Sequence, residues 1–173
     1  MPPDLFLFLR RAWSFDRRVT CRISASEHRA TGRAVWAIPT LHANNSTAEV
    51  MSSHADNNST TSISLTQTEE GTLTLGNARD AAALTVRAAY SWLWASSSSQ
   101  SDAVIQFPDG RIFLEGINFL GSACSAHHDC SPDSYEGHFK RTEDGKGFCI
   151  SYSVIGPRKD YTSITTYLPL QED

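Results

Sequence analysis

The chain has 173 residues, of which 40% are hydrophobic and 20% are charged, and its formal net charge is −4. This length fits a single domain of ordinary size, with enough apolar side chains to form a core. The negative balance argues against nucleic acid or an anionic membrane surface as the main partner.

The N-terminal segment has only part of the pattern of a secretion signal. Its apolar run, Leu5 to Leu9, is shorter than the usual minimum of about seven residues. The basic pair Arg10-Arg11 follows the run instead of preceding it. The four cysteines have irregular spacing that matches no disulfide framework; they are Cys21, Cys124, Cys130 and Cys149. We therefore expect an intracellular, cytoplasmic protein with free thiols and no membrane span.

The first predicted elements are a helix and a hairpin. Residues 5–13 favour a short helical lead-in that covers one end of a core. Between residues 13 and 23, apolar side chains recur at every second position, a pattern broken only by Arg17. Such alternation is typical of a half-buried antiparallel strand. A turn at 24–28 and a second strand at 29–38 complete the predicted hairpin.

The segment 42–61 differs in composition and is dominated by Asn, Ser, Thr and Ala. A segment this polar buries too little surface to offset the entropy lost on ordering. We therefore predict a mobile polar insertion within one domain that spans residues 1–173. The insertion is either an inert loop or a lid over a site.

Strand patterns resume after the insertion. Residues 63–75 alternate, whereas 81–94 contains three consecutive alanines, which favour a helix. In the second stretch, however, hydrophobic residues occupy six alternating positions, which favours a strand; they are Leu84, Val86, Ala88, Tyr90, Trp92 and Trp94. Two short runs, 104–107 and 111–114, flank an Asp-Gly pair and predict a hairpin.

The last part of the chain predicts a polar loop and then more strands. The loop spans about 127–134, and strands are expected at 135–141, 148–154 and 162–168. The total is about eight to ten antiparallel strands, and so long a sheet must curl or split to cover its apolar face. Because closure also removes exposed edges, we predict a mainly β fold, a single antiparallel β-barrel with a short N-terminal helix. A β-sandwich and an α+β cone with a helix at 77–92 are the alternatives.

Two motifs in the C-terminal half carry a family resemblance. They are His128-x-Cys130-x-Pro132-Asp133-x-Tyr135-x-Gly137 and Gly156-Pro157-Arg158-Lys159-Asp160-Tyr161. With them, the chain resembles an uncharacterised domain-of-unknown-function family, number 6314 in that series. The family looks lipocalin-like, and Trp13 is similar to the tryptophan that closes calycin barrels. The resemblance implies a barrel and brings no established activity.

The same motifs contain the candidate catalytic residues. His128 is the best general acid or base, because an imidazole titrates near neutral pH, and Asp133 could orient its ring. Tyr135 and Tyr161 could donate a proton or hold a carbonyl oxygen, and Arg158 could fix a carboxylate. We expect the first three of these residues to converge with Arg158 or Tyr161 at one end of the barrel.

Plainer interpretations of these residues stay open. His128 could simply hydrogen-bond its own loop, and Arg158 could form a salt bridge with an acid such as Glu70. On a strand, only one of the pairs Arg158/Asp160 and Lys159/Tyr161 can face the interior.

The candidate substrate-binding residues are mostly aromatic, because barrels enclose ligands in apolar cavities with a few polar groups. The set is Trp36, Glu70, Tyr90, Trp92, Phe113, Phe119 and Lys159. The cysteine and histidine spacing matches no zinc site, and the phosphate-loop and dinucleotide fingerprints are lacking. We therefore expect neither a metal nor a cofactor.

Three functions fit these features. The first is a cofactor-independent enzyme that moves a proton on a small, largely apolar organic metabolite, in an isomerisation, dehydration or cyclisation. The second is a non-catalytic binding or carrier barrel for a small hydrophobic ligand. The third is an accessory module that binds another protein through a sheet face.

Overall fold

The computed structural model describes residues 4–39, 62–76, 83–95 and 102–170. Within these ranges the chain forms one helix and ten strands. The elements are α1 (Asp4–Leu9), β1 (Ala12–Cys21), β2 (Ser26–Ala37), β3 (Ser62–Leu75), β4 (Ala83–Ala95), β5 (Ala103–Gln106), β6 (Ile112–Ile117), β7 (Cys124–Cys130), β8 (Asp133–Arg141), β9 (Phe148–Gly156) and β10 (Lys159–Pro169).

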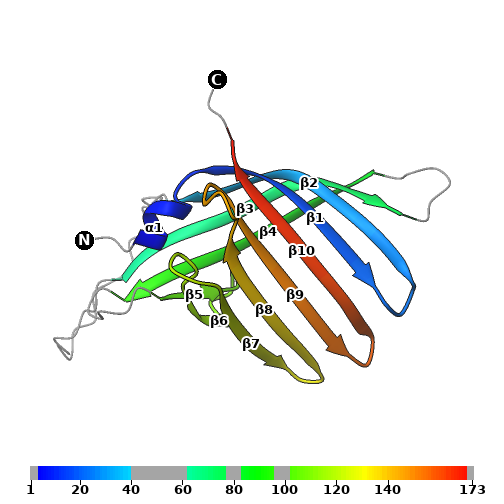
Figure 1. Cartoon of the computed structure of the whole chain (residues 1–173). Helices are drawn as coiled ribbons and strands as arrows, with labels where there is room; N and C mark the ends of the chain where they lie inside the picture. Colours follow the sequence, from blue (N-terminus) through cyan, green and yellow to red (C-terminus); the bar gives the residue numbers. More distant parts are fainter. Residues whose placement is uncertain (1–3, 40–61, 77–82, 96–101, 171–173) are drawn as a thin grey trace, which may run out of the picture.

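All ten strands belong to one antiparallel sheet, in the order β6-β5-β4-β3-β2-β1-β10-β9-β8-β7. Neighbouring strands in the sheet are also consecutive in the chain, with the exception of β1 and β10. These two strands bring the beginning and the end of the chain together, and Arg17 of β1 lies opposite Thr165 of β10. The sheet curls until its outer strands β6 and β7 lie in contact, which gives a nearly closed barrel (Figure 1). The predicted mainly β barrel with a short N-terminal helix is therefore confirmed.

The hydrophobic core fills the end of the barrel next to α1. Leu5, Phe6 and Leu9 of the helix are buried, and Phe6 meets Trp94 edge to face, with 5.5 Å between the ring centroids. Large aromatic side chains from six strands continue this core; they are Trp13, Trp36, Trp92, Trp94, Phe139, Phe148 and Tyr167. Trp13, at the start of β1, donates its indole N–H to the carbonyl of Leu9 at 3.1 Å, which ties the helix to the barrel.

Alternation along the strands decides which side chains face inward. In β1 the apolar side chains of Trp13 and Phe15 are buried, and Arg17 follows them on the same face. In β3, Leu65, Gln67 and Glu69 are buried in the same way. Because successive residues of a strand point to opposite faces, the inward set includes three polar or charged side chains.

Several predicted boundaries differ from the structure. The stretch predicted as a polar loop at about 127–134 is mostly a hairpin, because β7 ends at Cys130 and β8 begins at Asp133. The second strand begins at Ser26 within the predicted turn at 24–28, and the turn lies earlier, where Ala25 has a φ of 46°. The described part of the predicted helix of the α+β alternative, from residue 83 onward, is strand β4. The predicted insertion at 42–61 lies outside the described residues.

Candidate functional site

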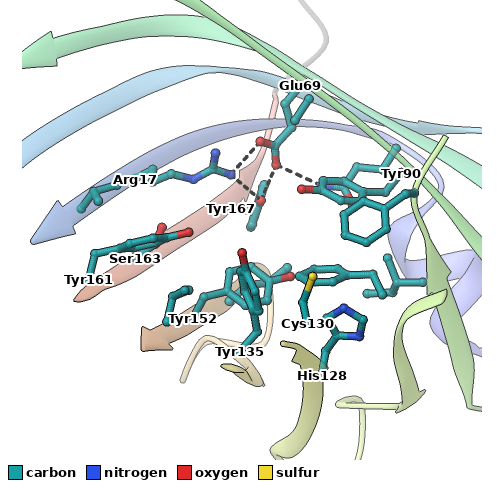
Figure 2. Close-up of a pocket in the computed structure, with 18 residues that line it drawn as sticks. Arg17, Glu69, Tyr90, His128, Cys130, Tyr135, Tyr152, Tyr161, Ser163 and Tyr167 are labelled. Atoms are coloured by element: carbon teal, nitrogen blue, oxygen red, sulfur yellow. Dashed lines mark hydrogen bonds and ion pairs between the residues drawn. The ribbon is translucent and has the colours of Figure 1, made fainter. Parts of the chain in front are cut away.

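A cavity of about 520 Å³ opens inside the barrel, beyond the aromatic core that adjoins α1 (Figure 2). It is lined by side chains from β1, β3, β4, β5, β6, β7, β8, β9 and β10 or from the segments next to them. The chain has five tyrosines, and all of them lie on this wall; they are Tyr90, Tyr135, Tyr152, Tyr161 and Tyr167. The cavity wall is therefore rich in aromatic rings, with hydroxyl groups distributed over its surface.

A buried ion pair lies on one side of the cavity. Arg17 Nη2 donates to Glu69 Oε2 at 2.6 Å, and Arg17 Nε donates to the Thr165 hydroxyl at 2.8 Å. The Tyr167 hydroxyl donates to Glu69 Oε1 at 2.5 Å. Figure 2 shows Arg17, Glu69 and Tyr167 joined in this way. The Glu69 side chain is only 4% exposed, whereas that of Arg17 is 25% exposed.

The surroundings of Arg17 stabilise its positive charge. Burial disfavours the charged guanidinium, but Tyr167 and Glu69 outweigh that effect and raise the pKa of Arg17. The Gln67 amide also donates to Glu69 Oε1 at 3.0 Å, and the Trp92 indole donates to Gln67 Oε1 at 2.7 Å. Each oxygen of Glu69 therefore accepts at least one hydrogen bond from a protein donor.

The other phenols differ from Tyr167. The hydroxyls of Tyr90, Tyr152 and Tyr161 make no hydrogen bond to any residue that the structure describes. Burial is the main cause that raises the pKa of each of them, and the charge of Glu69 contributes at Tyr90. These three phenols keep their protons across the neutral range, so each offers the cavity a hydrogen-bond donor.

His128 reaches the cavity because it lies on the inner face of β7. Its ring packs against Phe113 at 5.6 Å and Tyr135 at 6.0 Å between centroids. Its neighbour His127 points outward and pairs with Asp129 at 2.9 Å. Cys130 follows on the inner face and also lines the cavity, and Figure 2 shows His128, Cys130 and Tyr135 together, away from Arg17 and Glu69.

A second polar cluster lies where β8 and β10 begin. The Lys159 ammonium contacts Asp133 Oδ2 at 2.6 Å and donates to the Tyr135 hydroxyl at 2.9 Å. The bonds to Asp133, first, and to Tyr135 raise the pKa of Lys159. The two motifs meet here because Ser134 of β8 lies opposite Ile155 of β9, and the turn after β9 leads directly into β10.

The structure brings together only part of the predicted catalytic group. His128, Tyr135 and Tyr161 line one cavity, as the convergence prediction requires of these three. Asp133 pairs with Lys159 instead of His128. Arg158 is exposed in the turn between β9 and β10 and is absent from the wall, because that turn lies beyond the last inward-facing residues of both strands.

The predicted substrate-binding residues divide in a similar way. Tyr90 and Phe113 line the cavity. Trp36, Trp92 and Phe119 are buried in the aromatic core and lie off the wall, because their positions are nearer to α1. Glu70 faces outward and pairs with Arg87 at 2.7 Å, so the salt bridge to Arg158 considered above is not formed. Lys159 contacts the wall residue Tyr135.

The polar centre formed by Arg17, Gln67 and Glu69 was not among the predicted site residues. The alternating pattern of the sequence does indicate that two of these residues face inward. Arg17 interrupts the apolar face of its strand, and Glu69 lies an even number of positions after the apolar Leu65, so both fall on the same face. A charged residue on an inward face has to find a partner or a function.

Among the described residues, no cluster of three or more His, Cys, Asp or Glu side chains could hold a metal ion. No helix in that part of the chain is long and apolar enough to cross a membrane.

The comparisons with known proteins agree with this fold. A family model described as "Family of unknown function (DUF6314)" matches residues 9–169. A solved structure of an S-type phycobiliprotein lyase from Guillardia theta superposes with a TM-score of 0.64 at 8% identity, over 98% of this chain and 93% of that chain. No curated protein matches the sequence. At so low an identity the structural likeness shows a shared fold.

Proposed function

We propose that this chain, which belongs to the family of unknown function DUF6314, binds a small, largely apolar organic molecule inside its barrel. The observation that carries the proposal is the cavity of about 520 Å³, whose wall combines aromatic and aliphatic side chains with a few polar groups. Ligand sites typically have volumes of about 300–1,000 Å³, with an apolar wall and a few placed polar groups.

The distribution of side chains within the barrel supports this proposal. One end is filled by a continuous aromatic core, whereas the other end carries hydroxyls and an imidazole with no partner among the described residues. These side chains are half-buried on a concave wall, where a ligand can complete their hydrogen bonds. An internal cavity favours a small molecule over the alternative of a protein-interaction module, which would use an outer sheet face.

The structural neighbour, an S-type phycobiliprotein lyase, is consistent with the proposal. A barrel of this kind can enclose a small organic ligand.

The test is a matched pair of substitutions in β4. Ala88 lines the cavity, whereas Ala89 is exposed on the outer face. Titration with the neutral fluorophore N-phenyl-1-naphthylamine should give saturable binding to the wild type. Ala88→Trp should weaken that binding at least tenfold because the indole fills the cavity, and Ala89→Trp should leave it unchanged. Equal binding by both variants would contradict the proposal.

Acid–base catalysis is the second candidate, favoured by the position of His128. The imidazole lies on the cavity wall beside Tyr135, whose hydroxyl is held by the Lys159 ammonium at 2.9 Å. His128 would accept or donate a proton on the ligand, and Tyr135 would hold the oxygen that gains or loses charge. Such an arrangement suits a cofactor-independent isomerisation, dehydration or cyclisation.

Its test uses the adjacent histidines as matched variants. The wild type is incubated with a metabolite extract, and compounds that it consumes or forms are identified by mass spectrometry. His128→Gln should reduce any turnover by about a hundredfold or more, while His127→Gln, which changes only the outer face, should not. If both variants react as fast as the wild type, or if no compound is transformed, the barrel is a carrier.

A further inference from the structure

The cavity wall carries three hydrogen-bond donors that are available to a ligand. The donors are the hydroxyls of Tyr90 and Tyr152 and the Nη1 group of Arg17, which have no hydrogen-bond partner among the described residues. Arg17, Tyr90 and Tyr152 all line this one cavity (Figure 2). A guanidinium can only donate, so it has to meet an acceptor.

The carboxylate and amide oxygens nearest to Arg17 already accept hydrogen bonds from the protein. Glu69 accepts from Arg17, Tyr167 and Gln67, and the Gln67 oxygen accepts from Trp92. A ligand that offered only donors to this side would leave the Arg17 Nη1 group without an acceptor. An acceptor oxygen on the ligand would complete the hydrogen bonds of that group.

The charge balance determines what kind of oxygen fits. Arg17 is neutralised by Glu69 at 2.6 Å, and the glutamate side chain is 4% exposed. A ligand carboxylate here would add a second negative charge beside Glu69 in a largely apolar cavity, at an effective desolvation cost of several kcal/mol. An uncharged oxygen accepts the same hydrogen bonds without that cost.

The surrounding rings add a requirement of shape. Tyr90 stacks on Phe113 with an interplanar angle of 20°, and Phe107 lies 4.9 Å from Phe113 between centroids. These faces favour flat, unsaturated molecules over branched aliphatic ones.

We propose that the ligand is a planar conjugated carbonyl compound, uncharged at its oxygen, which accepts hydrogen bonds from Arg17, Tyr90 and Tyr152. This inference rests on the proposed binding function and names the chemical class that the site selects. Ketones, lactams and quinones all belong to this class, because all three present the same acceptor.

The test compares three probes of similar shape by calorimetric titration of the full chain. They are 9-fluorenone, which has the carbonyl, fluorene, which has a methylene in its place, and fluorene-9-carboxylate, which has a charged acceptor. The wild type should bind 9-fluorenone at least tenfold more tightly than fluorene and more tightly than the carboxylate.

Three variants connect the preference to the named donors. Tyr90→Phe/Tyr152→Phe removes two hydroxyls and keeps the rings, and Arg17→Met/Glu69→Gln removes both charges together, so that no lone buried charge remains. Each should reduce the preference for 9-fluorenone over fluorene to less than threefold while fluorene still binds. The control Arg29→Met, in an exposed pair with Asp16, should retain the full preference.

The outcomes separate this inference from the proposed function. Equal wild-type affinity for 9-fluorenone and fluorene would overturn the carbonyl assignment and leave the binding function intact. Tighter binding of the carboxylate would overturn the uncharged character of the ligand. Failure of fluorene, 9-fluorenone and N-phenyl-1-naphthylamine alike would overturn both proposals.

Discussion

The single residues that decide this site are charged side chains on an inward face. Arg17 and Glu69 lie on strands that do not pair with each other, since β2 separates β1 from β3. Their side chains meet across the curved sheet with 2.6 Å between nitrogen and oxygen. The pair is therefore a tertiary contact that also supplies the polar part of the cavity.

Removing one partner of this pair should destabilise the protein far more than removing both. Glu69→Gln leaves the Arg17 charge without its counter-ion, and Arg17→Met leaves a buried carboxylate, so we expect each to cost about 3–5 kcal/mol. Arg17→Met/Glu69→Gln should cost clearly less than the sum. Urea unfolding of the four proteins measures this, and strictly additive losses would show that the two groups are independent.

Individual residues also show where sequence reasoning stopped. The interruption of an apolar face by Arg17 is visible in the sequence, but its partner is not, because Glu69 and Glu70 are adjacent and only strand parity separates them. Glu70 belongs to the outer face and pairs with Arg87. A shift of one residue in the predicted register would exchange their roles.

At the scale of elements, the hairpin of β7 and β8 determines the composition of the wall. Its inward residues include His128, Cys130 and Tyr135 instead of large aliphatic side chains, because this end of the barrel encloses a cavity. The same polar composition made the stretch resemble a loop in the sequence. The structure shows that this stretch is a strand, because β7 pairs continuously with β8 and His128 lies opposite Tyr135.

The contact between β2 and β3 depends on a pair of glycines. Gly32 lies opposite Gly71, and a Cβ on Gly32 would collide with the backbone oxygen of Glu70. A Cβ on Gly71 would approach the Phe15 ring to 2.8 Å and the Thr31 backbone more closely still. The two strands can therefore approach and bend at this point only because both residues lack a side chain.

Gly32→Ala should lower the free energy of unfolding by about 2–4 kcal/mol, because the obstacle is backbone and cannot rotate away. Gly121→Ala is the matched control, since a Cβ there meets no atom within 4 Å. Chemical denaturation followed by circular dichroism gives both values. A decrease in the free energy of unfolding below about 0.5 kcal/mol for Gly32→Ala would mean that β2 and β3 can move apart to accommodate the added methyl group.

At the scale of the whole molecule, the barrel gathers all five tyrosines around one cavity although they come from β4, β8, β9 and β10. Burial raises the pKa of Tyr90, Tyr152, Tyr161 and Tyr167. In the unfolded chain these phenols would titrate near the ordinary value of about 10. Folding therefore changes the proton affinity of four of the five tyrosines on the cavity wall.

Stability should consequently fall as the pH rises above about 10. Below that value both states hold the phenolic protons, so this contribution is fully present. Above it the unfolded chain releases protons that the folded chain retains, which favours unfolding. Tyr152→Phe should make the decline shallower, by at most about 1.4 kcal/mol per pH unit.

Urea unfolding at several pH values and absorbance at 295 nm check this pH dependence. In the folded protein at about pH 11, fewer phenolates should be present than after unfolding at the same pH. Titration of all five phenols near pH 10 in the folded protein would show that the wall is open to solvent.

The sequence by itself determined the class of fold and the location of most strands. Period-two alternation over 63–75 and the alternating hydrophobic positions of 81–94 were sufficient to predict strands, because that pattern requires one buried face. It also identified the two C-terminal motifs that meet at the beginning of β8 and β10, and it named His128, Tyr135 and Tyr161, which share the cavity.

Only the tertiary structure decided which inward-facing residues fill the core and which surround a cavity. Trp92 and Tyr90 lie on the same face of one strand, yet the first is buried with Gln67 and the second lines the wall. Alternation specifies the face of a strand but not the depth along the barrel axis. That depth, and the contact of Arg17 with Glu69, depend on the curvature that closes ten strands into one barrel.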